Sequence, residues 1–125
     1  MVKSREQKEK DDQAKKVRYL VNTDSEDLPT SVDWRLENAV TEIKDQLDCN
    51  SPYAHAAVGA VESARFIASK RLTPLSEQQV IDCSSPYGNN GCTEGNLVST
   101  WQYIIGSDGI ANPLESEIGY PYKNF

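Results

Sequence analysis

The sequence contains little of what a metal centre needs: one histidine, three cysteines and no Cys-x-x-Cys spacing in 125 residues. Zinc sites are built from clustered cysteine and histidine ligands, so a metal site is not expected, nor is any other cofactor. Long apolar runs are missing too, and none approaches the roughly 18 residues of a membrane helix. The 38% hydrophobic and 26% charged residues are typical of one soluble globular domain with some disordered length.

A concentrated basic surface, which a nucleic-acid site would need, is also lacking. The formal net charge is −6. Residues 1–18 carry seven Lys/Arg against four Asp/Glu, a net of +3, so the other 107 residues carry −9. A basic tail before an acidic body can indicate nucleic-acid or membrane contact. Here the charges alternate without aromatic residues, which is typical of a solvated arm, and neither partner is predicted.

The clearest periodicity begins at Pro52 and predicts a long helix. Proline suits the first helical position, and Asn50 or Ser51 could cap in front of it. Apolar side chains recur every three or four residues, which indicates one buried face. The predicted buried residues are Ala54, Ala57, Val58, Val61, Ala64 and Ile67 or Ala68.

Two shorter helices are predicted further along the chain. Ser76 with Gln79 forms a capping box for the first, whose buried side is Val80 and Ile81. The second runs over residues 96–105 and ends near Gly106, a plausible C-cap. Its inward residues are predicted to be Leu97, Trp101, Ile104 and Ile105.

Several segments together resemble the papain-like cysteine peptidases, the cathepsin family. QLDCNSPYAH at 46–55 is similar to the active-site segment of that family, whose local signature is C-G-[SA]-C-[WY]. The opening of the mature enzyme is matched by LPTSVDWR at 28–35. Later landmarks are matched by LTPLSEQQVIDC at 72–83, GCTEG at 91–95 and GYPY at 119–122.

The resemblance implies an α+β fold, specifically the helix-rich left half of the two-domain papain fold. Residues 28–125 would be this subdomain, mainly helical with short strands and loops, and the second subdomain would be absent. Residues 1–27 would be a polar, partly disordered arm, similar to the end of a propeptide.

The resemblance also assigns the site residues, with one departure. Gln46 takes the oxyanion-hole position and Pro52 takes the position of the nucleophilic cysteine. Glu94 and Gly95 stand where a glycine pair contributes to a substrate subsite, so Glu94 replaces a glycine. The catalytic His and Asn of the family come from the other half of the molecule, and His55 is expected to be a packed structural residue. No catalytic residue is therefore predicted.

Three cysteines cannot all pair within one molecule. The family topology implies a Cys49–Cys92 disulfide, and it pairs the position of Cys83 with a cysteine just beyond Phe125. We expect either that the true chain is longer or that Cys83 is an unpaired, buried thiol.

The predicted function is that of a catalytically inactive homologue, which acts by binding if it acts at all. One alternative is a fragment of a cysteine-type endopeptidase, and another is a degenerate gene product with no selected function. Predicted partners are a complementary papain-like half, a propeptide or inhibitor, or a second copy at the exposed interdomain face. The family suggests a lysosomal or extracellular location, but residues 1–20 show no signal peptide, so localisation stays open.

Overall fold

The computed structural model describes residues 29–106 and 110–123. The chain divides into two units, Met1–Val32 and Asp33–Phe125. The predicted polar arm at residues 1–27 lies outside the described residues, as do residues 107–109 in the second unit. The site and its supporting contacts are all in the second unit.

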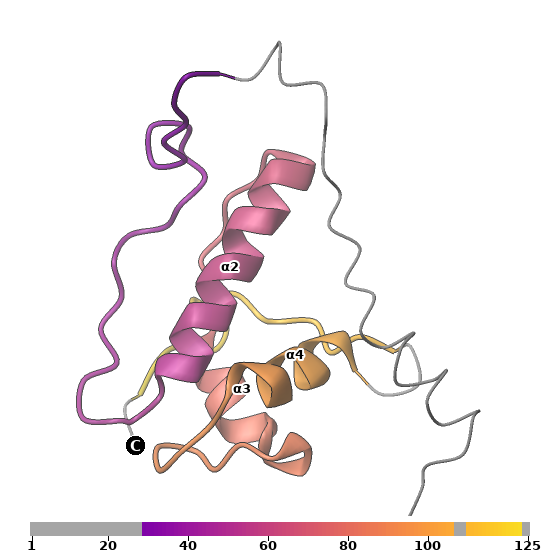
Figure 1. The fold of residues 1–125 in the computed structure, drawn as a ribbon. Coiled ribbons are helices and arrows are strands. Elements are labelled where there is room, and N and C mark those ends of the chain that lie inside the picture. The colour runs from indigo at the N-terminus through magenta and orange to yellow at the C-terminus, as the bar shows by residue number, and fades with distance from the viewer. Residues whose placement is uncertain (1–28, 107–109, 124–125) are drawn as a thin grey trace, which may run out of the picture. The chain divides into compact units, whose positions relative to one another are not determined.

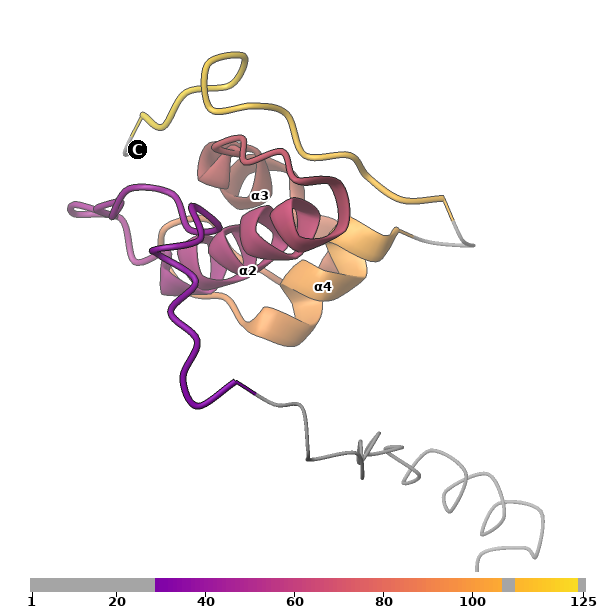
Figure 2. The same cartoon turned by 90° about the horizontal axis from the view of Figure 1, so that it is seen from above.

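The second unit is built from helices: α2 (Pro52–Ser69), α3 (Glu77–Cys83), the short 3₁₀ helix η2 (Ser85–Tyr87) and α4 (Leu97–Ile105). Both α3 and α4 pack against α2 (Figures 1 and 2). The predicted helix-rich fold is thus observed. Within the described ranges, the expected short strands are represented only by isolated bridges, one between Leu75 and Ser116 and one between Asn90 and Glu94. None of the helices in this part of the chain is both long and apolar enough to cross a bilayer.

Helix α2 begins at Pro52, as predicted. Its first half is buried through Tyr53, Ala54, Ala57 and Val58, and the small alanines allow the neighbouring helices to approach closely. The predicted burial of Ala64, Ile67 and Ala68 is wrong, since all three are exposed. The reason is visible in Figure 1, where the last turns of α2 extend beyond α3 and α4.

Helix α3 is capped by Ser76, whose side chain accepts a hydrogen bond from the Gln79 backbone N–H at 3.0 Å. The Gln79 side chain does not complete the box. Its amide instead donates to Tyr103 Oη and accepts from the Glu115 backbone N–H at 2.7 Å. Only half of the predicted capping box therefore forms, because the glutamine ties α3 to α4 and to the C-terminal segment. Val80 and Ile81 are buried, as predicted.

Helix α4 has the predicted end at Gly106 but not the predicted inward face. Its buried residues are Ser99, Thr100 and Tyr103. Leu97 and Ile105 are exposed, and Trp101 and Ile104 are only half-buried. The assignment was wrong because Thr100 and Tyr103, which hydrogen-bond to Asn89 and Gln79, take the buried side of the helix.

The core lies where these helices meet. Its buried members come from the start of α2, from α3 and the residue before its cap, and from α4: Cys49, Tyr53, Ala54, Val58, Leu75, Val80, Ile81 and Tyr103. Because Cys49 and Tyr53 belong to this core, the segment predicted to carry the functional site is anchored in the buried core of the unit.

Candidate functional site

The segment preceding α2 has a fixed course. A disulfide joins Cys49 to Cys92, as the resemblance implied. Leu47 adopts a left-handed conformation with φ 53°, and the Gln46 carbonyl oxygen accepts hydrogen bonds from Cys49 N at 3.3 Å and Tyr122 Oη at 2.6 Å. The backbone at the predicted oxyanion-hole position is therefore held by the disulfide-bonded Cys49 and by Tyr122 of the C-terminal segment.

Pro52 lies at the first position of α2 and is exposed. Ser51 in front of it is fully buried and occupies the N-cap position, but it makes no side-chain capping hydrogen bond. This departs from the expected cap. The Ser51 hydroxyl points elsewhere, 3.4 Å from the Cys49 carbonyl oxygen and 3.4 Å from His55 Nδ1.

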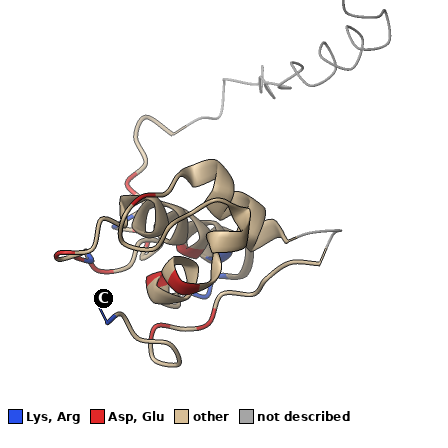
Figure 3. Cartoon of the chain, turned by 90° about the horizontal axis from the view of Figure 1, so that it is seen from below, with Lys and Arg blue, Asp and Glu red and all other residues tan. Residues whose placement is uncertain are grey.

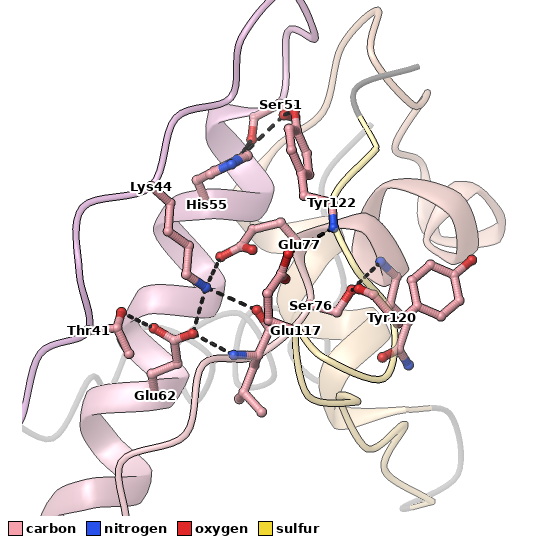
Figure 4. Close-up of polar contacts among 12 residues, drawn as sticks. Thr41, Lys44, Ser51, His55, Glu62, Ser76, Glu77, Glu117, Tyr120 and Tyr122 are labelled. Atoms are coloured by element: carbon pink, nitrogen blue, oxygen red, sulfur yellow. Dashed lines mark hydrogen bonds and ion pairs between the residues drawn. The ribbon is translucent and has the colours of Figure 1, made fainter.

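His55 is a packed residue, in line with its predicted structural role. Its Nδ1 lies 3.0 Å from the Ser51 carbonyl oxygen. Since a carbonyl can only accept, this contact is a hydrogen bond in the tautomer that carries the proton on Nδ1. The imidazole also meets the edge of the Tyr122 ring, with 5.3 Å between centroids (Figure 4). The Ser51 and His55 pair presents no nucleophile to solvent, because the serine is buried.

The loop at residues 90–95 is fastened to the start of α2. Asn50 donates from its backbone to the Cys92 carbonyl at 3.1 Å and from its side chain to the Thr93 carbonyl at 2.9 Å. Tyr53 Oη donates to the Gly91 carbonyl at 2.7 Å. Together with the disulfide, these contacts place the predicted subsite loop and the predicted nucleophile position at the same end of α2.

Gly95 is required by close packing rather than by an unusual φ. A Cβ added there would lie 2.5 Å from carbons of the Tyr53 ring, a distance that real Cβ atoms do not tolerate. The neighbouring Glu94 is exposed, and its carbonyl accepts a hydrogen bond from Asn90 N at 2.8 Å. Tyr53 thus packs against Gly95 and hydrogen-bonds to Gly91, while Glu94 remains exposed to solvent.

A buried charged cluster beside this site was missed by sequence reasoning. Lys44 Nζ lies 2.7 Å from Glu62 Oε1, 2.6 Å from Glu77 Oε1 and 3.0 Å from the Leu75 carbonyl oxygen (Figure 4). Glu62 also accepts hydrogen bonds from the Thr41 hydroxyl and the Leu75 backbone N–H. Glu62 follows Val58 by four residues on α2, so its place on the buried face was a signal that could have revealed it.

The electrostatics of the cluster follow from one ammonium and two carboxylates. Burial disfavours the charged form of Lys44, but Glu62 and Glu77 outweigh this effect and raise its pKa. Burial raises the pKa of Glu77 above its ordinary value, and Lys44 offsets part of that rise. The cluster pins the segment that leads to Gln46 onto α2 and α3.

The remaining predicted residues are easily placed. Cys83, at the end of α3, carries a free and exposed thiol, so the expectation of a buried thiol is wrong. In the part of the chain that the structure describes, no group of three or more His, Cys, Asp and Glu side chains could hold a metal ion.

Comparison with protein families gives one match across most of the chain. Residues 28–125 match the model described as papain family cysteine protease. Among individual proteins, the chain is 48% identical over 95 residues to a silicatein of Petrosia ficiformis and 45% identical over 96 residues to human cathepsin L2. These alignments cover 76% and 77% of this chain but only 27% and 28% of the relatives, so the chain spans about a quarter of their length.

Solved structures agree in fold. The bromelain protease of Ananas comosus, solved in complex with the E64 inhibitor, has 40% sequence identity and a TM-score of 0.67 over 78% of this chain and 42% of that one. A digestive procathepsin L 3 of Tenebrio molitor has 45% identity and a TM-score of 0.68 over 81% of this chain and 32% of that one. The observed helices correspond to the helix-rich half of this fold, as predicted.

Proposed function

Since this chain belongs to the papain family of cysteine proteases, we propose that it is a catalytically inactive member that acts by binding. The observation that carries the proposal is Pro52, at the position where the resemblance places the nucleophilic cysteine. The chemistry of the family needs a thiolate, and proline offers no nucleophilic atom. Proline is favourable at the first helical position, so the helix persists while the reaction is lost.

The neighbouring side chains support the loss of catalysis, because each has another role. Cys49 is consumed by its disulfide with Cys92. Ser51 is fully buried, and His55 Nδ1 packs 3.0 Å from the Ser51 carbonyl oxygen. None of these groups could take over as an accessible nucleophile with a free base beside it.

The binding activity that we propose uses the loop at residues 90–95 and accepts an extended peptide, such as a propeptide or inhibitor segment. A short extended segment can pair with exposed backbone in the manner of an added strand. The exposed Glu94 carboxylate would favour a basic side chain in such a peptide. Within this proposal, residues 28–125 form the binding domain and a complementary papain-like half is a further partner.

The proposal can be tested with an epoxide thiol trap and a fluorogenic dipeptidyl substrate. Cys83 is an exposed thiol, so the chain should be assayed as Cys83→Ser, both alone and combined with Pro52→Cys. We expect no hydrolysis and no covalent adduct by intact mass for Cys83→Ser, and one adduct once Pro52→Cys supplies a thiol. Trap-sensitive hydrolysis by Cys83→Ser would overturn the proposal.

A second candidate is proteolysis, favoured by the family model and by relatives whose names denote peptidases. It requires a nucleophile that this segment does not supply. The same hydrolysis assay separates the two candidates. Peptide binding is tested independently by titrating Cys83→Ser with extended peptides that differ in one basic residue, and with Glu94→Gln as the matched variant.

A further inference from the structure

The loop at residues 90–95 begins with the only Asn-Gly step in the sequence, Asn90-Gly91. An asparagine followed by glycine is the pair at which a protein most readily loses a side-chain amide without an enzyme. Glycine has no Cβ, so its backbone nitrogen is open to approach by the side chain of the preceding residue. By sequence, Asn90 is therefore the most reactive amide of the chain, provided that the fold leaves it free.

The fold does leave Asn90 free. Its side chain is exposed and, among the residues that the structure describes, has no hydrogen-bond partner. The Gly91 backbone N–H likewise has no acceptor among those residues. The loop is held instead through the Asn90 backbone, whose N–H donates to the Glu94 carbonyl at 2.8 Å and whose carbonyl accepts from Thr93 N at 3.0 Å. The two reacting atoms, Asn90 Cγ and the Gly91 nitrogen, are thus outside the contacts that hold the loop.

The adjacent Asn89 has the opposite environment. It is 3% exposed. Its Nδ2 donates to Ser84 Oγ at 2.9 Å and to Thr100 Oγ1 at 3.0 Å. Its Oδ1 accepts from the Asn96 backbone N–H at 2.9 Å. Rotating this side chain would leave buried polar groups without partners, which is strongly unfavourable. Asn89 therefore serves as an unreactive control beside Asn90.

We propose that Asn90 is a site of spontaneous deamidation. The Gly91 nitrogen loses its proton and attacks Asn90 Cγ, so that a new C–N bond forms and the amide nitrogen of Asn90 leaves as ammonia. Water then opens the succinimide ring at either carbonyl and gives aspartate or isoaspartate. The net reaction consumes one water and releases one ammonia, and it needs no oxidant, reductant or further reactant. Each product is a carboxylic acid that is ionised at neutral pH.

The modification changes the charge of the loop. From Ser84 to Thr93 the chain carries no charged residue, and this stretch between α3 and α4 is tan in Figure 3. The new carboxylate arises at position 90, which forms an isolated bridge with Glu94. The Cys49–Cys92 disulfide does not involve this side chain, so it still ties the loop to α2. In a consequence that rests on the proposed function, a second carboxylate strengthens the preference of the loop for a basic peptide.

Peptide mapping by mass spectrometry tests the modification. Folded Cys83→Ser protein with its disulfide intact is incubated in mildly alkaline buffer enriched in ¹⁸O water. We expect a mass gain at Asn90 that includes a solvent oxygen, while Asn89 keeps its amide. The rate should lie within about tenfold of that in a short unstructured peptide of residues 86–95 with its cysteine alkylated, because one net hydrogen bond of the turn opposes the motion.

Asn90→Gln is the matched variant. It keeps an amide at this position, but its carbonyl carbon is one methylene further from the Gly91 nitrogen, and ring closure is much slower. We expect no mass gain in the loop of this variant. An Asn90 amide that survives in the folded chain after the peptide has lost its own would overturn the proposal, and so would an equal gain at Asn89.

The effect of the new charge is measured separately. Asn90→Asp and Asn90→Gln are titrated with extended peptides that differ in one basic residue. Asn90→Asp should bind the basic peptide roughly twofold to fivefold more tightly, the gain typical of one exposed charge pair. Equal binding by the two variants would contradict the charge effect, whereas no binding by either would contradict the proposed function. The mass measurement decides the deamidation in both cases.

Discussion

Replacing Lys44 by methionine tests whether the charged cluster holds the segment that leads to the site. Methionine keeps much of the length of lysine but cannot donate to the Glu62 and Glu77 carboxylates, which are 1% exposed. Removing one partner of a buried ion pair typically destabilises a protein by 3–5 kcal/mol. The Lys44 side chain is itself 24% exposed, which allows some hydration. We therefore expect the free energy of unfolding to fall by about 3 kcal/mol at neutral pH.

The loss of unfolding free energy in Lys44→Met should depend on pH, and the burial of the carboxyl groups sets the direction of this dependence. Without Lys44, the effect of burial on Glu77 is no longer offset, so the pKa of Glu77 in the folded state rises further above its value in the unfolded state. A raised folded pKa means stability that is present at low pH and is lost as pH rises through that pKa. The gap between wild type and Lys44→Met should thus narrow as pH falls from neutral towards the unfolded pKa of Glu77, about 4.5. In wild type, the pKa of Lys44 in the folded state is raised above its ordinary value of 10.5. Lys44 therefore stabilises the fold fully below pH 10.5, and this contribution is lost only as the pH rises above that value.

Urea unfolding followed by circular dichroism, with the disulfide intact, measures both effects. Lys70→Met is the matched control, because Lys70 is exposed and its ammonium lies 5.5 Å from the centre of the Phe66 ring. The control should lose less than about 1 kcal/mol. The reasoning is refuted if Lys44→Met costs no more than the control at neutral pH, or if its loss is the same near pH 4.5.

Two further predictions concern close packing and a tyrosine. Gly95→Ala should destabilise the fold by about 1–3 kcal/mol in urea unfolding, because its Cβ would meet the Tyr53 ring at 2.5 Å. Gly59→Ala, where a Cβ meets nothing within 4 Å in the middle of α2, should instead stabilise it by roughly 0.5–1 kcal/mol; equal effects would contradict the argument. Tyr120 donates a hydrogen bond to the Asp82 carboxylate, which raises its pKa to about 12. Asp82→Asn should return that pKa towards 10, as measured by NMR titration of labelled tyrosine, and an unchanged value would refute the assignment.

Local chemistry made the ends of the helices predictable, while non-local hydrogen bonds decided their faces. Pro52 and Gly106 mark helix ends because backbone geometry alone favours them there. The face of α4 was misassigned because Thr100 is oriented by Asn89, eleven residues earlier, through a contact that no periodicity reveals. The Lys44 cluster was missed for a related reason: lysine and glutamate are rarely buried, so a pattern of charges indicates solvent unless their partners are known.

The arrangement of these contacts explains how a binding site could outlast catalysis. The loop at residues 90–95 is held by the disulfide and by Tyr53, and the Gln46 backbone is held by Tyr122. None of these interactions uses the Pro52 side chain, so under the proposed function a proline at this position would remove the nucleophile without loosening the groups around it. Under the proposed function, catalysis would then depend on position 52, while binding would depend on the residues that hold the loop. If the proposed peptide binding uses this loop, the contacts of Tyr53 with Gly91 and Gly95 should support it, because they fix the loop to the start of α2.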